Sequence, residues 1–473
     1  MVVLLVVVAV VALLAGVHWY VWRRLVRDTT APGGVARRVG TTAVWVLPLL
    51  SVGALVSGRA GAPFWVQRVV AWPGYLWLAV LLYLVLALVV GEAVRPVLRG
   101  VLGRRAGVSG SGTPAAGFGA APETDRPETD RPETDRPETD RPETDRPVAV
   151  GAAAQATDDK ATALATAQEI APALDAGAVR TDMGSEAVRT ADVAGARPGV
   201  SRRMFVSRIV GGAAAAVALG TVGYGTYGVL RGPRVKRVTV PLARLPRAAH
   251  GFRIAVVSDI HLGPALGRAH TQRIVDTINA TSPDLVAVVG DLVDGSVADL
   301  GPAAEPLAQL EARHGAFFVT GNHEYFSGAE AWVEHVRELG LHPLRNERVE
   351  IGGFDLAGVN DVAGESEGDG PDFAKALGDR DRRRASVLLA HQPVVIHDAV
   401  EHGVDLQLSG HTHGGQLWPG NHLAALANPT VAGLERYGDT QLYVTRGAGA
   451  WGPPVRVGAP SDITVVQLAS RTA

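Results

Sequence analysis

The stretch DLVAVVGDLVDG, residues 284–295, decides how this chain folds. Its first half is a continuous apolar run, which is the pattern of a strand buried on both faces of a sheet. Gly290 and Asp291 follow the run directly, so a carboxylate stands where the strand would end. The stretch therefore predicts a strand of a layered α/β domain with Asp291 at its carboxyl end.

Similar apolar runs recur through the C-terminal half of the chain, separated by helix-like stretches. They span residues 253–258, 316–321, 386–390, 404–410, 442–447 and 463–468. Alternating strands and helices predict one α/β domain, which we place at residues 235–473, with helices covering the faces of its sheet.

Side chains of the kind that bind metals or protons follow five of the apolar runs. They are Asp259, His261, Asp291, Asn322, His323, His391, His411 and His413. Because the carboxyl ends of strands line the binding crevice of open α/β sheets, we expect these side chains to meet at one place. Each alone has a simpler interpretation, such as a turn residue or a core histidine. Five such junctions together favour a common site.

All of these residues except His323 are candidate metal ligands. A single transition metal takes roughly four to six ligands, and a catalytic metal keeps one position open. Seven donors therefore predict two ions that share a bridging carboxylate. In GHTHGGQ, residues 410–416, a histidine pair on one zinc is the alternative. We expect instead an extended segment in which His411 and His413 face neighbouring ions and Thr412 is turned away.

Five motifs resemble, in order and spacing, those of the calcineurin-like metallophosphoesterase superfamily: DIH, GDLVDG, GNHE, LLAHQP and GHTHGGQ. GHTHGGQ followed by YVTRGAGAWGPPVR is similar to its membrane-anchored bacterial phosphodiesterase branch, and the composition resembles that of a GC-rich bacterium. The resemblance implies a four-layer αββα sandwich. It also implies two divalent or trivalent metal ions of Mn, Fe or Zn type.

Carried onto this chain, the resemblance assigns two ligand sets that share one carboxylate. The first metal would have Asp259, His261, Asp291 and His413, and the second Asp291, Asn322, His391 and His411. The implied function is that of a metal-dependent phosphoric ester hydrolase in which hydroxide held between the metals attacks phosphorus. Phosphomonoesters and phosphodiesters both suit such a centre. A lipid-linked or pyrophosphate substrate, such as a UDP-diacylglucosamine-type glycolipid, is one candidate.

Four further residues near these motifs have predicted roles. His323 stands beside Asn322, where it is placed to act as general acid for the leaving oxygen. Glu324 is expected either to orient His323 or to be a solvated carboxylate at a helix start. Arg446 is expected either to contact substrate phosphate or to form a surface salt bridge. Asp294 is interpreted as a turn residue.

The N-terminal part has the pattern of membrane-spanning helices. Residues 2–22, 41–57 and 69–91 are apolar runs, and the first is long enough to cross ~30 Å of hydrocarbon. Arginines follow the first run rather than precede it, which favours a retained span over a cleaved signal peptide. Arginines are dense at 23–38 and 95–105, so the positive-inside rule places the N-terminus outside and the chain after residue 95 in the cytoplasm.

A linker and a fourth apolar run join these spans to the C-terminal domain. Residues 106–205 include five tandem copies of PETDR and are expected to form a disordered spacer. Residues 206–232 predict a fourth span. SRRMFV before it resembles a twin-arginine export signal, but two arginines flanking a membrane helix explain it equally well. A fourth crossing predicts a multi-pass protein of the cell membrane with its C-terminal domain outside the cytoplasm.

The overall composition excludes several functions. The chain has no cysteine, which removes disulfides, thiolate metal sites and cysteine nucleophiles. Its net charge of -2 lacks the basic footprint of nucleic-acid binding, so we expect no nucleic-acid partner, and the charge disfavours a nuclease of the same superfamily. The alternative to a membrane-anchored enzyme is a non-catalytic membrane sensor or binding module. Such a module would be expected to have lost a ligand or the acid, and none is missing here.

Overall fold

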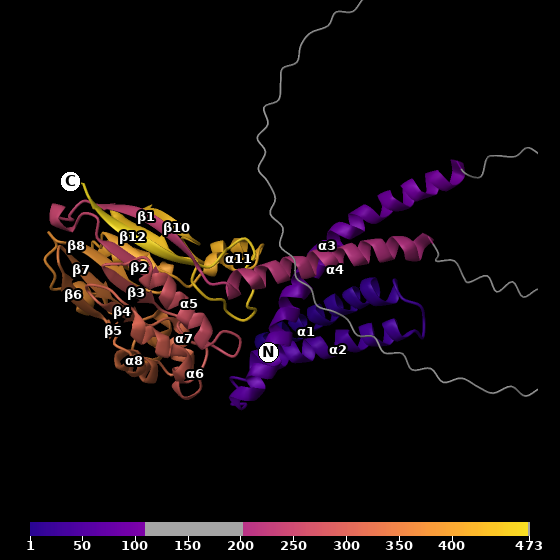
Figure 1. The fold of residues 1–473 in the computed structure, drawn as a ribbon, viewed down its shortest axis with the longest axis horizontal. Helices are drawn as coiled ribbons and strands as arrows, with labels where there is room; N and C mark the ends of the chain where they lie inside the picture. Colours follow the sequence, from indigo (N-terminus) through magenta and orange to yellow (C-terminus); the bar gives the residue numbers. More distant parts are fainter. Residues whose placement is uncertain (109–201, 472–473) are drawn as a thin grey trace, which may run out of the picture. The chain divides into compact units, whose positions relative to one another are not determined.

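The C-terminal domain is built from two six-stranded sheets. A computed structural model describes residues 1–108 and 202–471 (Figure 1). The predicted disordered spacer, residues 106–205, lies almost entirely outside the described residues.

The first sheet has a parallel centre. Its strands, in spatial order, are β1 (Arg234–Leu242), β12 (Asp462–Ser470), β2 (Arg253–Val257), β3 (Leu285–Val289), β4 (Ala316–Val319) and β5 (His342–Pro343). Strands β2 to β5 run parallel, and β12 runs antiparallel to β2. Parallel neighbours bring their carboxyl ends to the same edge of the sheet, which is where the candidate site lies.

The second sheet also has a parallel centre. Its strands, in spatial order, are β10 (Gly433–Tyr437), β11 (Thr440–Val444), β9 (Leu406–Ser409), β8 (Ala385–Leu389), β7 (Phe354–Gly358) and β6 (Glu347–Ile351). The four inner strands run parallel, and the two edge strands run antiparallel to their neighbours.

Helices cover the outer face of each sheet. The first sheet is covered by α5 (Arg268–Asn279), α6 (Val297–Ala304) and α8 (Ala329–Glu338), and the second by α9 (Phe373–Leu377) and α10 (Ile396–Glu401). Strand β2 shows how the layers form: Ile254 and Val256 belong to the core between the sheets, and Ala255 and Val257 pack on the helices. The predicted four-layer αββα fold is confirmed.

The apolar runs did not predict every strand. β1 and β6 lie at sheet edges and keep most of their residues exposed or partly exposed, so neither shows a continuous apolar run. A strand that is half solvated carries a weaker sequence signal than one buried on both faces.

Four long apolar helices lie outside the sandwich. They are α1 (Val2–Val21), α2 (Val35–Val56), α3 (Phe64–Val108) and α4 (Arg202–Leu230). Each contains a segment long and apolar enough to cross a membrane, and these helices overlap the apolar runs seen in the sequence. They support a membrane location for the protein.

The apolar helices contact the C-terminal domain through its loops. Leu417, Val455 and Val457 belong to one apolar cluster with side chains of α1, α3 and α4. The Tyr83 hydroxyl of α3 donates a hydrogen bond to the Trp418 carbonyl at 2.9 Å. Helix α4 also contacts the C-terminal domain, because the Arg456 backbone N–H donates to the Gly225 carbonyl at 3.3 Å.

Candidate metal centre

The structure brings the seven predicted ligands together at the strand ends of both sheets. One group is Asp259, His261, Asp291 and His413, and a second is Asp291, His391 and His411. Within each group the candidate ligand atoms lie within 4.8 Å of one another. Asn322 adjoins the second group, because its Oδ1 lies 3.1 Å from Nδ1 of His411. Asp291 is therefore common to two adjacent clusters.

In the first group, imidazole nitrogens turn toward carboxylates. His261 Nε2 lies 3.0 Å from His413 Nε2 and 3.6 Å from Asp291 Oδ2. His413 Nε2 in turn lies 3.3 Å from Asp259 Oδ1. The other ring nitrogen of His261, Nδ1, lies 3.0 Å from Asp294 Oδ1 and donates its N–H there. This hydrogen bond leaves the Nε2 lone pair facing the cluster, as in a histidine that binds a metal.

In the second group, His391 is held in the same way. Its Nδ1–H donates to the Val289 carbonyl at 2.9 Å, which turns Nε2 toward the cluster. That nitrogen lies 3.2 Å from Asp291 Oδ2 without the alignment of a hydrogen bond. A buried nitrogen without a hydrogen-bond partner is costly. His391 therefore fits a metal ligand better than a core histidine.

Five of the candidate ligands have left-handed backbone conformations. The φ angles are 51° at Asp259, 48° at His261, 53° at Asp291, 72° at His411 and 52° at His413. Such conformations cost residues other than glycine ~1–3 kcal/mol each, and they persist where the surrounding structure enforces them, as at functional sites. The strain is concentrated on the candidate ligands.

The expectation of an extended segment at His411–His413 is wrong. Thr412 between them has right-handed helical angles, and a 3₁₀ turn spans His413–Gly415. The Thr412 hydroxyl donates to the Val431 carbonyl at 2.6 Å and accepts from the Gly414 N–H at 3.2 Å. The two imidazoles reach the two groups because the chain turns tightly there, not because side chains alternate along a strand.

Two glycines in the motifs are required by close approach. A Cβ at Gly290, which has φ +71°, would lie 2.6 Å from His391 Nδ1. A Cβ at Gly410 would collide with the Asp259 carboxylate and the Ser258 hydroxyl. Both glycines therefore let strand ends from the two sheets meet at the cluster.

Asp294 is more than the turn residue that the sequence suggested. Its Oδ1 lies 2.6 Å from His323 Nδ1, as well as 3.0 Å from His261 Nδ1. Burial opposes ionisation of Asp294, but the two histidines outweigh it and lower its pKa to about 2. One carboxylate thus orients both the predicted acid and a candidate metal ligand. The signal in the sequence was its position three residues after Asp291.

Glu324 supports the Asp291 loop instead of orienting His323. Its buried carboxylate accepts hydrogen bonds from the backbone N–H groups of Asp291 (3.0 Å), Leu292 (2.8 Å) and Gly321 (2.6 Å). Burial, together with repulsion from Asp291, raises the pKa of Glu324 to about 7. The alternative of a solvated carboxylate is wrong.

Arg456, which sequence reasoning did not single out, holds the His413 loop. Its guanidinium is buried and donates to the carbonyls of His413 at 3.0 Å, Ala459 at 3.1 Å and Gly449 at 2.7 Å. The Arg456 backbone N–H also donates to the Gly225 carbonyl of α4, so Arg456 contacts both the apolar helix α4 and the candidate ligand His413. The feature of the sequence that could have indicated this role is the position of Arg456 at the end of the motif YVTRGAGAWGPPVR.

Arg446 lies beside the same loop. A Cβ on Gly414 would be 2.9 Å from Arg446 Cγ, so the side chain crosses over the residue next to His413. Its backbone N–H donates to Asp462 Oδ1 at 3.3 Å. A role in contacting substrate phosphate remains a prediction.

The electrostatics of the cluster suit cations. Burial alone lowers the pKa of His261, but Asp294, Asp291 and Asp259 outweigh it and raise that pKa to about 9. The pKa of His391 is likewise raised well above its ordinary value, because Asp291 overcomes the effect of burial. Concentrated carboxylate charge thus attracts positive charge. Together with the carboxylate, imidazole and amide donors, it fits divalent metal ions.

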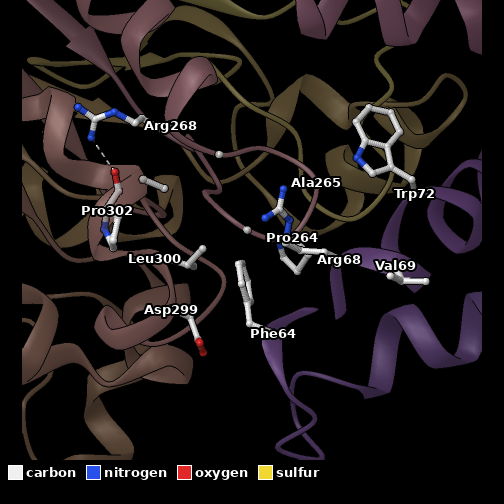
Figure 2. Close-up of a pocket in the computed structure, with 13 residues that line it drawn as sticks. Phe64, Arg68, Val69, Trp72, Pro264, Ala265, Arg268, Asp299, Leu300 and Pro302 are labelled. Atoms are coloured by element: carbon white, nitrogen blue, oxygen red, sulfur yellow. Dashed lines mark hydrogen bonds between the residues drawn. The ribbon is translucent and has the colours of Figure 1, made fainter. Parts of the chain in front are cut away.

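A pocket of about 550 Å³ lies beside the centre (Figure 2). One wall comes from the start of α3, with Phe64, Arg68 and Trp72, and the opposite wall from α6 and the loop before α5. The pocket adjoins the metal-binding loop at Gly263, which follows His261 closely. The apolar helix α3 therefore lines a pocket that adjoins the loop carrying His261.

Two mixed sheets with Asp, Asn and His ligands gathered at their strand ends define the class of αββα metallophosphoesterases. A family model described as calcineurin-like phosphoesterase matches residues 252–415, which include every candidate ligand and His323. The chain belongs to this metallophosphoesterase family.

Relatives come from bacteria and animals. A protein of Danio rerio named transmembrane protein with metallophosphoesterase domain is 40% identical over 259 residues, which are 52% of this chain and 59% of that protein. An uncharacterized metallophosphoesterase of Helicobacter pylori is 39% identical, covering 53% of this chain and 68% of the relative. One of Aquifex aeolicus is 34% identical, covering 50% and 91%. The predicted restriction to a bacterial branch is not borne out, because a vertebrate protein matches.

Proposed function

We propose that this protein is a membrane-anchored phosphoesterase that uses two metal ions, of Mn, Fe or Zn type, to hydrolyse phosphomonoesters or phosphodiesters. The shared carboxylate carries this proposal. Asp291 belongs to both ligand groups, and a carboxylate with two oxygens can bridge ions ~3.5–4 Å apart. When bound, such ions neutralise phosphoryl oxygens and lower the pKa of a coordinated water.

We assign His323 the role of general acid. Its ring lies beside the cluster: the ring centroid of His323 is 4.7 Å from that of His261 and 5.8 Å from that of Trp451. Because Nδ1 donates to Asp294, Nε2 is the nitrogen that gives its proton to the leaving oxygen as the phosphorus–oxygen bond breaks. Asp294 keeps the ring oriented during this transfer.

The substrate class that we propose is an amphiphilic phosphoester reached from the membrane, such as a lipid-linked phosphate or a pyrophosphate of the UDP-diacylglucosamine type. Two observations support it. The loop after His413 packs on membrane helices through Leu417 and the Trp418 carbonyl. The pocket beside the centre has an aromatic and cationic wall from α3, formed by Phe64, Trp72 and Arg68 (Figure 2).

Metal removal and resupply test the proposed activity. The full chain in detergent, stripped by a chelator, is expected to hydrolyse bis(p-nitrophenyl) phosphate or p-nitrophenyl phosphate only after Mn²⁺, Fe²⁺ or Zn²⁺ is added. Metal content and rate should rise together. Hydrolysis that persists in chelator would contradict metal dependence. Metal uptake without hydrolysis of either ester would favour the non-catalytic binding module.

We also propose that the C-terminal domain lies outside the cytoplasm. The arginine distribution supports this orientation. The start of α3 and the end of α4 both contact the domain, as expected if the two helices cross the membrane in opposite directions.

The chain has no cysteine, so single introduced cysteines can report on which side of the membrane a residue lies. An Arg383→Cys variant is expected to react with a membrane-impermeant maleimide in intact cells. Ala31→Cys, between α1 and α2, should react only after lysis; the reverse pattern would overturn the orientation.

A further inference from the structure

Helix α11 (Gly420–Ala427) presents apolar side chains to its surroundings and buries none of its residues. Leu423 and Leu426 are 72% and 84% exposed, and their spacing of three places them on one face of the helix. Trp418, just before α11, and Trp451 are 50% and 51% exposed. We call these four side chains the apolar rim. Exposed apolar patches of this kind mark contact surfaces.

The apolar rim is joined to the metal centre. Gln416 Nε2 donates to the Trp451 carbonyl at 2.9 Å, and the Trp451 N–H donates to Gln416 Oε1 at 3.0 Å. The Trp451 ring in turn lies 5.8 Å from that of His323. Through Trp451, the apolar rim therefore lies next to His323 at the cluster.

The apolar rim is also joined to the membrane helices. Leu417 forms β-bridges to Val457 and Gly458, which line a pocket together with Tyr224 and Tyr227 of α4. These tyrosines are exposed, and the Arg231 guanidinium lies 5.8 Å from the Tyr227 ring centre. Tyrosine and arginine at the end of a span are typical of the membrane–water interface. Helix α11 begins at Gly420, three residues after Leu417, and in the projection of Figure 1 it is drawn next to the end of α4.

We propose that the apolar rim inserts into the interfacial layer of the bilayer that α1 to α4 cross. Its continuity with the interfacial residues of α4 favours lipid as the occupant over a second copy of the chain. Helices of this kind lie in the plane of the interface with their apolar face in the acyl boundary. The segment GNHLAALA has no Lys, Arg, Asp or Glu, so insertion requires no anionic lipid. The contact holds the mouth of the metal centre at headgroup depth.

Depth-dependent quenching tests the insertion without requiring activity. The full chain is placed in phosphatidylcholine nanodiscs, one copy in each, with an environment-sensitive label on a Leu426→Cys or Leu423→Cys variant. Both labels are expected to shift to shorter emission wavelengths and to be quenched by lipids carrying a nitroxide. The matched control is Arg383→Cys, an exposed site away from α11, which should remain water-like. Water-like, unquenched emission from positions 423 and 426 would overturn the proposal. So would shielding that occurs only when two copies share one disc.

A second measurement links the insertion to substrate, and this part rests on the proposed phosphoesterase function. A Leu423→Gln/Leu426→Gln double variant should hydrolyse soluble p-nitrophenyl phosphate or its diester as the unaltered chain does. For an amphiphilic phosphoester in vesicles, KM should rise by about tenfold or more, the effect expected from one leucine left in water. An unchanged KM in vesicles would contradict the inferred role. If the unaltered chain hydrolyses neither substrate, the proposed function fails while the quenching result still decides insertion.

Discussion

Asp291→Asn is expected to abolish phosphoesterase activity and to remove bound metal from both positions. Asp291 Oδ2 lies 3.2 Å from His391 Nε2 and 3.6 Å from His261 Nε2, so one oxygen faces a histidine of each ligand group. Loss of an outer-shell partner alone costs roughly 10–100-fold in metal affinity or activity. Removing a charge that both proposed ions would share should therefore cost more than about 100-fold. Asparagine keeps the size of the side chain, which limits the effect to charge and coordination.

The measurement is metal content by mass spectrometry together with the hydrolysis rate of the reconstituted full chain. Asp276→Asn is the matched control, because Asp276 is an exposed carboxylate on α5 outside both groups. It should retain metal and rate. Normal metal content with normal rate in Asp291→Asn would rule out the bridging role and with it the proposed centre.

His323→Gln is expected to reduce the hydrolysis rate by an amount that depends on the basicity of the leaving oxygen. A general acid contributes typically 10²–10⁴-fold, and its help matters most when the leaving oxygen is strongly basic. We therefore expect a loss of about 10²-fold or more for an alkyl phosphoester and a much smaller loss for a p-nitrophenyl ester. Metal content should be unchanged, because His323 contributes its backbone N–H, not its ring, to Asp291.

Asp294→Asn separates orientation from proton transfer. As in His323→Gln, the rate should fall more for an alkyl ester than for a p-nitrophenyl ester. The loss should be smaller than in His323→Gln, because the acid is misoriented and not removed. It should also bind metal less tightly, since Asp294 holds the His261 ring. His397→Gln, an exposed histidine on α10, is the control. An equal loss for alkyl and p-nitrophenyl esters in His323→Gln would contradict the acid role.

The candidate ligands were predictable because their signal is local. A buried strand leaves a continuous apolar run, and a polar residue directly after it must lie at the sheet edge. Asp259, Asp291 and His391 each follow such a run and lie in the cluster. The edge strands β1 and β6 were missed for the same reason, because a half-exposed strand lacks the run.

The supporting residues were not predictable in this way. Asp294 was interpreted as a turn residue, and Glu324 either as a partner of His323 or as a solvated carboxylate at a helix start. Which of the neighbouring groups each carboxylate contacts depends on how β3 and α7 (Asn322–Ser327) approach each other, and that is set by packing between sheets and helices. Likewise, Arg456 shows its role only where its loop meets both His413 and α4.

The sequence by itself therefore determined the layered α/β domain, the residues at its strand ends and the apolar helices before it, because apolar runs and polar turns are properties of neighbouring residues. The tertiary structure alone decided which carboxylate holds which histidine, how His411 and His413 reach two groups through a strained turn, and where α11 lies relative to the membrane helices. Those features arise from contacts between residues far apart in the chain, which only the packed fold brings together.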